Sequence, residues 1–349
     1  MNCDLIGWDI GGAHLKAAAL KGDQLVAVIQ KPCPLWLGLE HFHAAARAIL
    51  DETGAGPGCR HAVTMTGELA DVFKNREEGV FGLLQALSQQ VPAESIRVFA
   101  GAKGFLRIAC LDIQAVPAIA SANWLATGFH AASRLEQGLL IDLGSTTADL
   151  LVLRDGEVLT RGYTDYERLR YEELVYCGVV RTSLMSLAQT APLAGEWIGL
   201  MAEHFATTGD LYRLTGELPE HADLMPTADG GEKTWEASAR RLARLVGRDL
   251  ESADSEAWRR LAEYFRERQL ARLAEACHRQ WSLGRLNCHA PVIGAGIGRF
   301  LVQELARRFG HPYLDFADLL PIHAIPSAFH AADCAPAVAV AYLARHRHA

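Results

Sequence analysis

The chain has 349 residues, of which 50% are hydrophobic and 21% are charged, and its formal net charge is −7. That length exceeds one ordinary hydrophobic core, so two domains are expected. The acidic balance excludes nucleic acid as the main partner, because no cluster of Lys and Arg interleaved with aromatic residues offsets it. An anionic small ligand would therefore be held by local N–H groups and metal.

Membrane insertion and secretion are not expected either. No apolar run approaches the roughly 20 residues that cross a bilayer, and the N-terminus runs directly into a strand pattern that does not resemble a signal peptide. The eight cysteines are scattered without a C-x-x-C pair, which is typical of buried free thiols in a reducing compartment. The sequence predicts a cytoplasmic protein, and it leaves homo-oligomer formation open.

The first part of the chain predicts an antiparallel meander. Strands are expected at 4–10, 15–20 and 24–30, with a glycine-rich turn after the first and a hairpin turn at Gly22-Asp23 after the second. In a Rossmann fold the glycine turn opens directly into a helix, so this order disfavours that fold. The next predicted elements are a helix at 39–52, a strand at 61–66, a helix at 77–90, a strand at 96–100 and a helix at 118–133.

A second meander begins at Gly138. Strands are predicted at 139–143, 148–154 and 157–161, with Asp155-Gly156 as the hairpin turn. The order of strand, Asp-x-Gly turn, strand, hairpin and strand repeats the first segment. Because repetition of a whole unit is a signal at the level of the fold, it indicates an internal duplication.

The rest of the chain is predicted to be mainly helical. Residues 215–233 are rich in Pro, Gly and Asp and are expected to form a loop, whereas 235–281 is expected to be helical. The remaining predictions are a strand at 291–294, a glycine segment at 294–298, and helices at 300–309 and 335–345. The expected domains are 1–130 with 325–349, and 131–324.

The two glycine turns carry the motifs that point most directly to function. Each is Asp-x-Gly at the end of an apolar run, and Asp9 and Asp142 lie 133 residues apart, about the size of one domain. An aspartate at a strand end can hold a divalent cation, and a glycine turn presents backbone N–H groups to a phosphate. One such turn per domain predicts an interdomain cleft that grips a phosphorylated ligand from both sides.

These pieces resemble the actin, hexokinase and Hsp70-like superfamily. The turn at Asp9 resembles its first phosphate loop, residues 142–149 resemble its second, and residues 294–298 resemble the glycine segment that lies beneath a nucleotide. The resemblance implies an α/β protein with the two-domain actin-like ATPase (ribonuclease H-like) fold, in which a mixed β-sheet with flanking helices is duplicated.

Within that superfamily the chain is similar to a narrower family, the tetrahydromethanopterin-linked one-carbon transfer proteins, which are related to the ether synthase of methanofuran (methylofuran) biosynthesis. The similarity covers most of the chain. It rests on Thr64-Met65-Thr66-Gly67-Glu68-Leu69-Ala70-Asp71 with Arg76, Glu78, Gly79 and Val80, on Ala122-Asn123-Trp124, and on residues 173–182.

This resemblance implies a transferase that forms an aryl ether. It would join (5-(aminomethyl)furan-3-yl)methyl diphosphate to the phenol of γ-glutamyltyramine, or of a tyrosine-like acceptor, and release diphosphate. Mg²⁺ held by a carboxylate would neutralise the leaving group. Asp9 and Asp142 are the first candidates for this metal and for catalysis, and Asp149 either holds water around the metal or lines its strand. An aspartate that caps its own turn is the alternative.

The phosphate oxygens are expected to accept hydrogen bonds from the glycine segments, and plain turn chemistry is the alternative. The candidates are Gly11, Gly12, Lys16, Gly144, Ser145, Thr146, Thr147, Gly294, Gly296 and Gly298. Lys16 has a surface-strand role as its alternative. Ala13 stands where sugar kinases usually carry a hydroxyl residue, which disfavours direct γ-phosphate transfer and favours the synthase.

The phenol, with a pKa near 10, would be helped by a positioned base, and Glu68 at the end of a strand is the preferred candidate. The alternative for Glu68 is a surface acid or a neighbour of a helix N-cap. The candidates for substrate binding are His14, Arg76, Asn123, Trp124 and Arg181. A packed histidine, a core tryptophan and surface or ion-pair arginines are their alternatives.

Two other functions remain open at this point. An ATP-dependent small-molecule kinase of the same fold is supported by residues 294–298. A non-catalytic nucleotide-binding protein would associate in response to nucleotide without forming a product.

Overall fold

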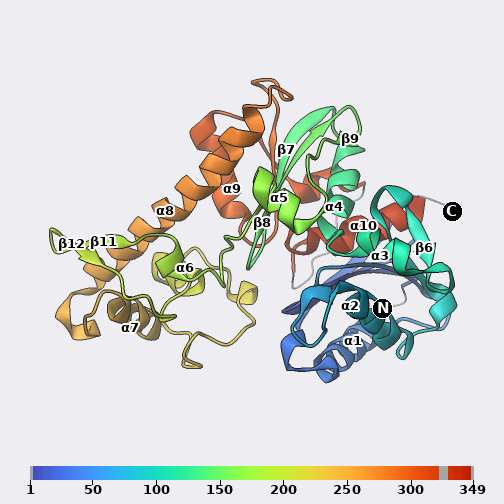
Figure 1. The fold of residues 1–349 in the computed structure, drawn as a ribbon, viewed down its shortest axis with the longest axis horizontal. Helices are drawn as coiled ribbons and strands as arrows, with labels where there is room; N and C mark the ends of the chain where they lie inside the picture. The colour runs from blue at the N-terminus through green and yellow to red at the C-terminus, as the bar shows by residue number, and fades with distance from the viewer. Residues whose placement is uncertain (1–2, 322–328, 347–349) are drawn as a thin grey trace. The chain divides into compact units, whose positions relative to one another are not determined.

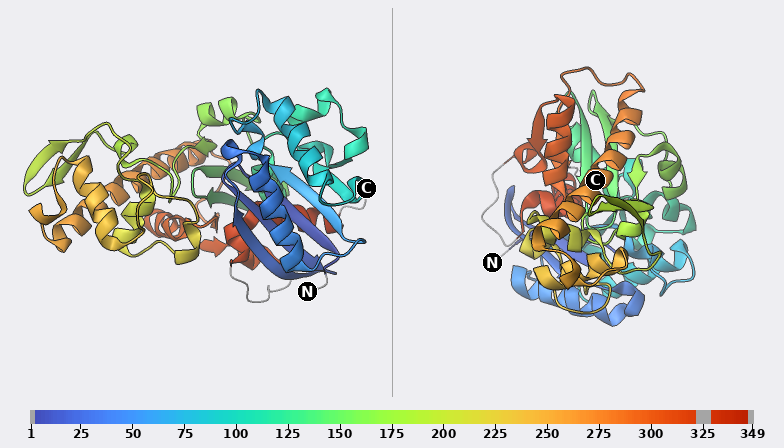
Figure 2. Two further views of the ribbon diagram at one scale, coloured as in Figure 1. Left: turned by 90° about the horizontal axis from the view of Figure 1, so that it is seen from below. Right: turned by 90° about the vertical axis from the view of Figure 1, so that its left-hand side faces the viewer.

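The computed structural model describes residues 3–321 and 329–346, and its packing divides the chain into two compact units (Figures 1 and 2). The first unit comprises residues 1–140, 151–167 and 314–349, and the second comprises residues 141–150 and 168–313. The predicted domain boundary at residues 324 and 325 lies outside the described residues.

The strands have the following bounds. They are β1 (Leu5–Ile10), β2 (His14–Lys21), β3 (Gln24–Pro32), β4 (Arg60–Met65), β5 (Ile96–Phe99), β6 (Phe105–Arg107), β7 (Gln137–Leu143), β8 (Ala148–Arg154), β9 (Glu157–Val158), β10 (Leu174–Val175), β11 (Thr190–Leu193), β12 (Glu196–Gly199), β13 (Val292–Ala295) and β14 (Tyr313–Asp315).

The helices have the following bounds. They are α1 (Leu39–Thr53), α2 (Arg76–Ser88), α3 (Val116–Ile119), α4 (Asn123–Ala132), α5 (Asp165–Tyr171), α6 (Thr208–Thr215), α7 (Trp235–Leu245), α8 (Ser255–Trp281), α9 (Arg299–Phe309) and α10 (Ala335–His346).

The first unit is built on a mixed sheet with the strand order β3-β2-β1-β4-β5-β6. Strands β1, β2 and β3 form the predicted antiparallel meander, while β4 pairs parallel to β1 and β5 parallel to β4. Helices α1 and α2 cover one face and α10 covers the other (Figures 1 and 2). Every residue of β1 is buried, as expected for a central strand with both faces covered.

Small residues allow α10 to dock closely on β1. A Cβ at Gly7 would lie 2.2 Å from the carbonyl oxygen of Ala337 and 2.7 Å from Cβ of Ala341. The alanine-rich tail predicted as a helix therefore forms the second layer against the sheet, and the glycine in β1 makes this approach possible.

The predicted helix at 118–133 is wrong as a single element. The chain forms α3 and α4 there, and Ser121 between them has a φ of 51°. A left-handed residue cannot continue a right-handed helix, so the helix ends and a second one begins at Asn123. The run of small residues carried no signal for this break.

The second sheet repeats the plan of the first. Its order is β10-β8-β7-β13-β14, with β9 paired to β8. Asp155 and Gly156 have φ values of 53° and 82°, the left-handed pair that a type I′ hairpin requires. The duplicated meander and the α/β class with two mixed sheets and flanking helices are thus confirmed, although β9 is shorter than the predicted strand at 157–161.

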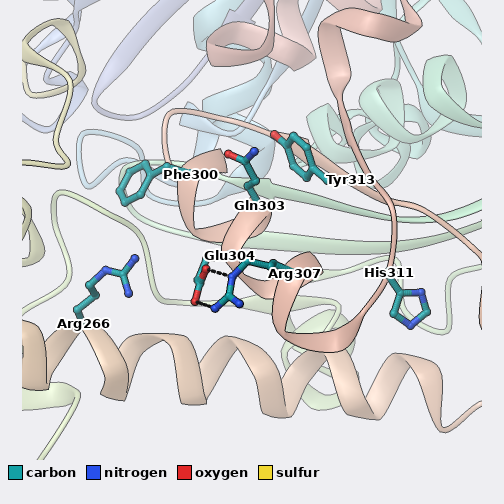
Figure 3. A pocket seen from close by; sticks show the side chains of 7 residues that line it. All are labelled: Arg266, Phe300, Gln303, Glu304, Arg307, His311 and Tyr313. Carbon is teal, nitrogen blue, oxygen red and sulfur yellow. Dashed lines mark hydrogen bonds and ion pairs between the residues drawn. The ribbon is translucent and has the colours of Figure 1, made fainter.

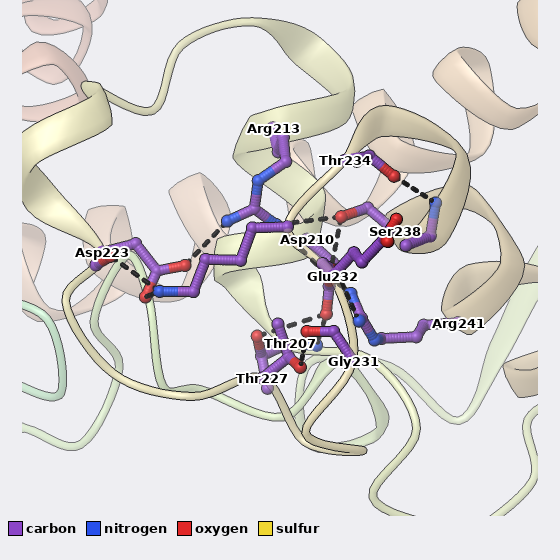
Figure 4. A network of polar contacts seen from close by, with 12 residues as sticks. Thr207, Asp210, Arg213, Asp223, Thr227, Gly231, Glu232, Thr234, Ser238 and Arg241 are labelled. Carbon is purple, nitrogen blue, oxygen red and sulfur yellow. Dashed lines mark hydrogen bonds and ion pairs between the residues drawn. The ribbon is translucent and has the colours of Figure 1, made fainter.

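The second unit also contains helices α6, α7 and α8, and a buried polar network joins α6 to α7 (Figure 4). Asp210 on α6 accepts hydrogen bonds from Arg241 and Ser238 on α7, each at 2.8 Å. Arg241 also donates to Asp229 at 2.8 Å, and Arg213 pairs with Asp223 at 2.7 Å. Because Asp223 and Asp229 belong to the predicted loop at 215–233, these ion pairs fasten that loop to α6 and α7.

Membrane-spanning helices and the cysteines are the last two features predicted from the sequence. In residues 3–321 and 329–346, no helix has the length and apolar character to cross a membrane. All eight cysteines are free thiols, but Cys110 and Cys288 are exposed, so the prediction that the thiols are buried is wrong for these two. Both lie in short or irregular segments, where no core is available to cover them.

Candidate functional site

The first glycine turn lies at the end of β1. Its backbone is closed by a hydrogen bond from the Gly11 N–H to the His14 carbonyl oxygen at 3.0 Å. Asp9 is 3% exposed, and its register partner Lys16 on β2 brings Nζ within 4.0 Å of Oδ2. The side chain of His14 is buried in β2. The structure therefore places the predicted Lys16 beside the predicted Asp9.

Asn123 reaches the same aspartate from the start of α4. Its Nδ2 donates to Asp9 Oδ1 at 3.3 Å, and its Oδ1 accepts a hydrogen bond from the Trp124 N–H at 2.7 Å. Trp124 itself is 2% exposed and packs edge-on against Tyr163. The position of Trp124 thus matches the core alternative, whereas Asn123 orients the carboxylate of Asp9.

Glu68 lies beside this turn because β1 and β4 run parallel. The Thr66 N–H donates to the Ile10 carbonyl oxygen at 2.9 Å, so both strands end at the same edge of the sheet. Glu68 follows in a short 3₁₀ turn (Gly67–Leu69) and is fully buried. Burial raises the pKa of its carboxyl group, and a hydrogen bond from the Ser121 hydroxyl opposes that rise.

Arg76 is held by an acid that the sequence analysis missed. Its guanidinium forms an ion pair with Asp165 at 2.6 Å, and Asp165 Oδ2 is also 3.3 Å from the Ser121 hydroxyl. Arg76 begins α2 and Asp165 begins α5. Nothing in the spacing of residues 76 and 165 signals this pairing, which depends on the tertiary fold.

The second glycine turn has the same backbone closure as the first. The Gly144 N–H donates to the Thr147 carbonyl oxygen at 2.8 Å, and these residues lie 133 positions after Gly11 and His14. Gly144, Ser145, Thr146 and Thr147 are all partly accessible. The Gly144 N–H is occupied by this closure, so the hydroxyl groups and remaining N–H groups of residues 145–147 are the ones that could meet an anion.

The segment at 178–181 packs against this second turn. A Cβ at Gly178 would lie 2.3 Å from the carbonyl carbon of Ser145 and from the nitrogen of Thr146. The Val180 and Arg181 N–H groups donate to the Ser145 carbonyl oxygen at 3.1 and 2.9 Å. Arg181 also approaches the Thr146 hydroxyl at 3.5 Å, so the predicted arginine does lie at the second turn.

The third glycine segment packs directly on the strand that carries Asp142. A Cβ at Gly296, whose φ is 79°, would lie 2.3 Å from the Leu143 carbonyl oxygen and 2.6 Å from Asp142 Oδ1. The Gly298 N–H donates to the Leu143 carbonyl oxygen at 2.8 Å. The predicted phosphate-binding segments at 142–149 and 294–298 therefore lie against each other. Position 296 requires glycine, because a side chain there would collide with the backbone of Leu143.

Asp149 is placed differently from the other two aspartates. It occupies the position that matches Lys16 in the duplication, and its Oδ1 lies 2.9 Å from the guanidinium of Arg168, whose side chain is 2% exposed. A cation at Asp149 would compete with this buried arginine. Arg168 also donates to the Glu173 carbonyl oxygen at 2.9 Å, which fixes the pair in the second unit.

A metal would have to be held by few protein ligands. In the described ranges 3–321 and 329–346, no three His, Cys, Asp or Glu side chains gather as a metal-binding group. Mg²⁺ is commonly bound by one or two carboxylates, with water and substrate phosphate oxygens completing its shell. Asp9, oriented by Asn123, can supply one such carboxylate. The described residues do not supply the several ligands that a site made of protein atoms alone would need.

The second unit also contains a cavity of about 410 Å³ beside α9 (Figure 3). It is lined by Arg266, Phe300, Gln303, Glu304, Arg307, His311 and Tyr313. Tyr313 joins this cavity to the third glycine segment, because a Cβ at Gly294 would lie 2.5 Å from its hydroxyl oxygen. The carboxylate of Glu304 forms an ion pair with the guanidinium of Arg307 at 2.8 Å.

Comparison with known proteins agrees with this architecture. The model of the hydantoinase/oxoprolinase family matches residues 60–343. A (4-{4-[2-(gamma-L-glutamylamino)ethyl]phenoxymethyl}furan-2-yl)methanamine synthase from Methanocaldococcus jannaschii is 30% identical over 257 residues, which cover 72% of this chain and 74% of the relative. A synthase of the same name from Methanococcus vannielii is 32% identical over 112 residues, covering 32% of this chain and 50% of the relative.

Among solved structures, a nucleotide-free acetone carboxylase aligns with a TM-score of 0.57 at 9% identity, covering 89% of this chain and 68% of that chain. This likeness shows the fold alone. The chain belongs to the hydantoinase/oxoprolinase family and to the family of the synthase from Methanocaldococcus jannaschii. It is accordingly an enzyme of that kind.

Proposed function

We propose that the chain is a transferase of methanofuran biosynthesis that joins (5-(aminomethyl)furan-3-yl)methyl diphosphate to the phenol of γ-glutamyltyramine or of a tyrosine-like acceptor. The observation that carries the proposal is the 30% identity, over 72% of the chain, to the Methanocaldococcus jannaschii synthase, whose name describes a phenoxymethyl-furan. In this reaction the bond from the exocyclic carbon to diphosphate breaks, and a bond from that carbon to the phenol oxygen forms. The phenol proton passes to a base.

Two aspartates would hold Mg²⁺, Asp9 in the first unit and Asp142 in the second. Bound there, the metal would neutralise negative charge on the departing diphosphate. Asn123 keeps the carboxylate of Asp9 oriented through its 3.3 Å hydrogen bond. Lys16, 4.0 Å from the same carboxylate, adds a positive charge that favours an anionic ligand at this turn.

The diphosphate would be bound by backbone N–H groups and hydroxyls of the glycine turns. Gly12 supplies them in the first unit, and Ser145, Thr146 and Thr147 supply them in the second. Gly11 and Gly144 shape the two turns, because their N–H groups close the turn backbone. That both turns serve one ligand is the sequence-based prediction, and it is part of this proposal. Arg181, beside Thr146, is the guanidinium assigned to the phosphate oxygens.

Glu68 is the proposed base for the phenol. Its burial supports the assignment, since a carboxyl group with a raised pKa accepts a proton more readily than an exposed one. A buried base also belongs to a site from which water is kept, and water would otherwise capture a furfuryl cation.

The test is direct assay of the purified chain with both substrates and Mg²⁺, with the ether product detected by mass spectrometry and diphosphate release measured in parallel. Glu68→Gln is expected to lower the rate by about 10²–10⁴-fold, the usual contribution of a general base. Glu77→Gln, an exposed acid on α2, is the matched control and should keep wild-type activity. If the wild-type chain forms no ether with either phenol, the proposal is wrong.

The kinase or nucleotide-binding alternative is favoured by one observation, the cavity that Tyr313 connects to the third glycine segment. Thermal-shift measurements with Mg²⁺ and ATP, ADP or diphosphate separate these functions, because a ligand that binds the folded state raises its apparent stability. Stabilisation by ATP with formation of a phosphorylated product would favour the kinase. Stabilisation by diphosphate alone would favour the synthase.

A further inference from the structure

Four side chains of the first unit form a continuous polar chain that begins at the buried Glu68. Ser121 Oγ lies 2.8 Å from Glu68 Oε1 and 3.3 Å from Asp165 Oδ2, and Asp165 Oδ2 lies 2.6 Å from the Arg76 guanidinium. Exposure increases along this chain. Glu68 is 0% exposed and Ser121 is 5% exposed, whereas the side chains of Asp165 and Arg76 are 22% and 34% exposed.

The conformation of Ser121 is unusual for this residue type. Its φ of 51° lies in the left-handed region, which glycine and asparagine enter more easily than serine. The residue lies just after α3, and its backbone turns the chain into α4. A serine kept in a strained conformation at a candidate active site suggests that its hydroxyl is needed there.

The hydrogen-bonding capacity of this group explains the arrangement. A serine hydroxyl has one proton to donate and two lone pairs that accept, yet Ser121 Oγ is within hydrogen-bonding distance of two carboxyl groups. Ser121 Oγ donates its proton to Glu68 Oε1, and Asp165 Oδ2 is the second acceptor within its reach. Arg76 forms the ion pair with Asp165 at the other end of the chain. The other oxygen of Glu68, Oε2, is buried and has no hydrogen-bond partner among the described residues.

The groups around Glu68 shift its pKa in both directions. Burial has the largest effect and raises its pKa, while the Ser121 hydrogen bond and Arg76 on α2 favour its ionised form and Asp165 on α5 disfavours it. Helix α2 is packed against the Glu68 backbone, because a Cβ at Gly79 would lie 2.2 Å from the Glu68 carbonyl oxygen. The backbone that carries the Glu68 carboxyl group is therefore closely packed.

We propose that Ser121 is a positioning residue that holds Glu68 Oε1 by donating its hydroxyl proton, so that Oε2 is left to accept the proton of the reaction. This inference rests on the proposed function, in which Glu68 accepts the phenol proton. As Oε2 takes that proton, the phenol O–H bond breaks and the Oε2–H bond forms. Once Glu68 is neutral, the Ser121 hydroxyl can turn its proton from Oε1 to Asp165 Oδ2, 3.3 Å away. After the ether leaves, Oε2 returns the proton to water.

Ser121→Gly removes the hydroxyl and relieves the left-handed strain, so this variant should fold at least as well as the wild type. Its kcat is expected to fall about tenfold or more, with KM for both substrates unchanged and the pH profile of kcat shifted. Ser121→Ala should show the same loss of kcat. Ser133→Ala, at the end of α4, removes a hydroxyl that donates to the His130 carbonyl oxygen and is the matched control.

A second readout does not depend on activity. In an infrared pH titration, the carboxyl stretch that is absent in Glu68→Gln should appear at a higher pH in Ser121→Gly than in the wild type, because a hydrogen bond that favours the ionised form is lost. An unchanged titration, or an unchanged kcat and pH profile in Ser121→Gly with active wild type, overturns the positioning role. If the wild type forms no ether but the titration shifts, the proposed function fails and the hydrogen bond from Ser121 to Glu68 stands.

Discussion

Replacement of Gly178 by alanine tests how the second glycine turn is held. The added methyl carbon would lie 2.3 Å from the carbonyl carbon of Ser145 and from the nitrogen of Thr146. Both neighbours are backbone atoms, which cannot rotate away as the end of a side chain can. Overpacking of this kind costs about 1–3 kcal/mol, and we expect the upper end of that range.

For a unit of this size, about 3 kcal/mol corresponds to a fall in Tm of about 6–12 °C. Differential scanning calorimetry of Gly178→Ala measures this fall. Gly199→Ala is the matched control, because a methyl group added to Gly199 on β12 would meet no other atom within 4 Å. Since Ser145 and Thr146 are proposed to bind diphosphate, KM for the furan diphosphate should rise in Gly178→Ala alone. An unchanged Tm and KM would refute the reasoning.

Three further predictions concern stability. Arg168→Met leaves Asp149 without its buried ion-pair partner and should cost about 3–5 kcal/mol in urea unfolding, while Arg154→Met, in an exposed pair, should cost at most about 1 kcal/mol. Arg241→Met should destabilise the second unit by a similar 3–5 kcal/mol or so, unlike Arg244→Met, whose pair is half exposed. Burial lowers the pKa of His61 and His130 to about 4, so their neutral forms are favoured in the folded state. The contribution of the two neutral histidines to the free energy of unfolding should be complete above a pH of about 6.5 and should be lost as the pH drops towards 4, by up to about 3 kcal/mol for each histidine. Urea unfolding curves that coincide at about pH 7.5 and about pH 5 would contradict this.

The sequence determined the local plan of both sheets. Alternating apolar runs, hairpin turns at Gly22 and at Asp155-Gly156, and the Asp-x-Gly motif depend on residues close together in the chain, so their periodicity is visible without a structure. The duplication was visible for the same reason. It recurs in three dimensions as the matching turn closures at Gly11 and Gly144.

Part of the candidate site followed from the sequence as well. The sequence motifs predicted four residues of the first unit, Asp9, Lys16, Glu68 and Asn123. The fold brings the first three to the end of the sheet at which β1 and β4 finish, and it brings Asn123 there from the start of α4. Two parallel neighbouring strands must end at the same edge, which explains why motifs 59 residues apart in sequence, at Asp9 and Glu68, converge.

Only the tertiary structure decided the partners of the charged groups. Asp165 lies 89 residues from Arg76 and Arg168 lies 19 residues from Asp149, and no local pattern marks either pair, because an ion pair between elements depends on how helices pack against the sheet. The break at Ser121 was hidden for a related reason. Small residues tolerate a helix, so their propensity gives no signal for a left-handed residue at Ser121.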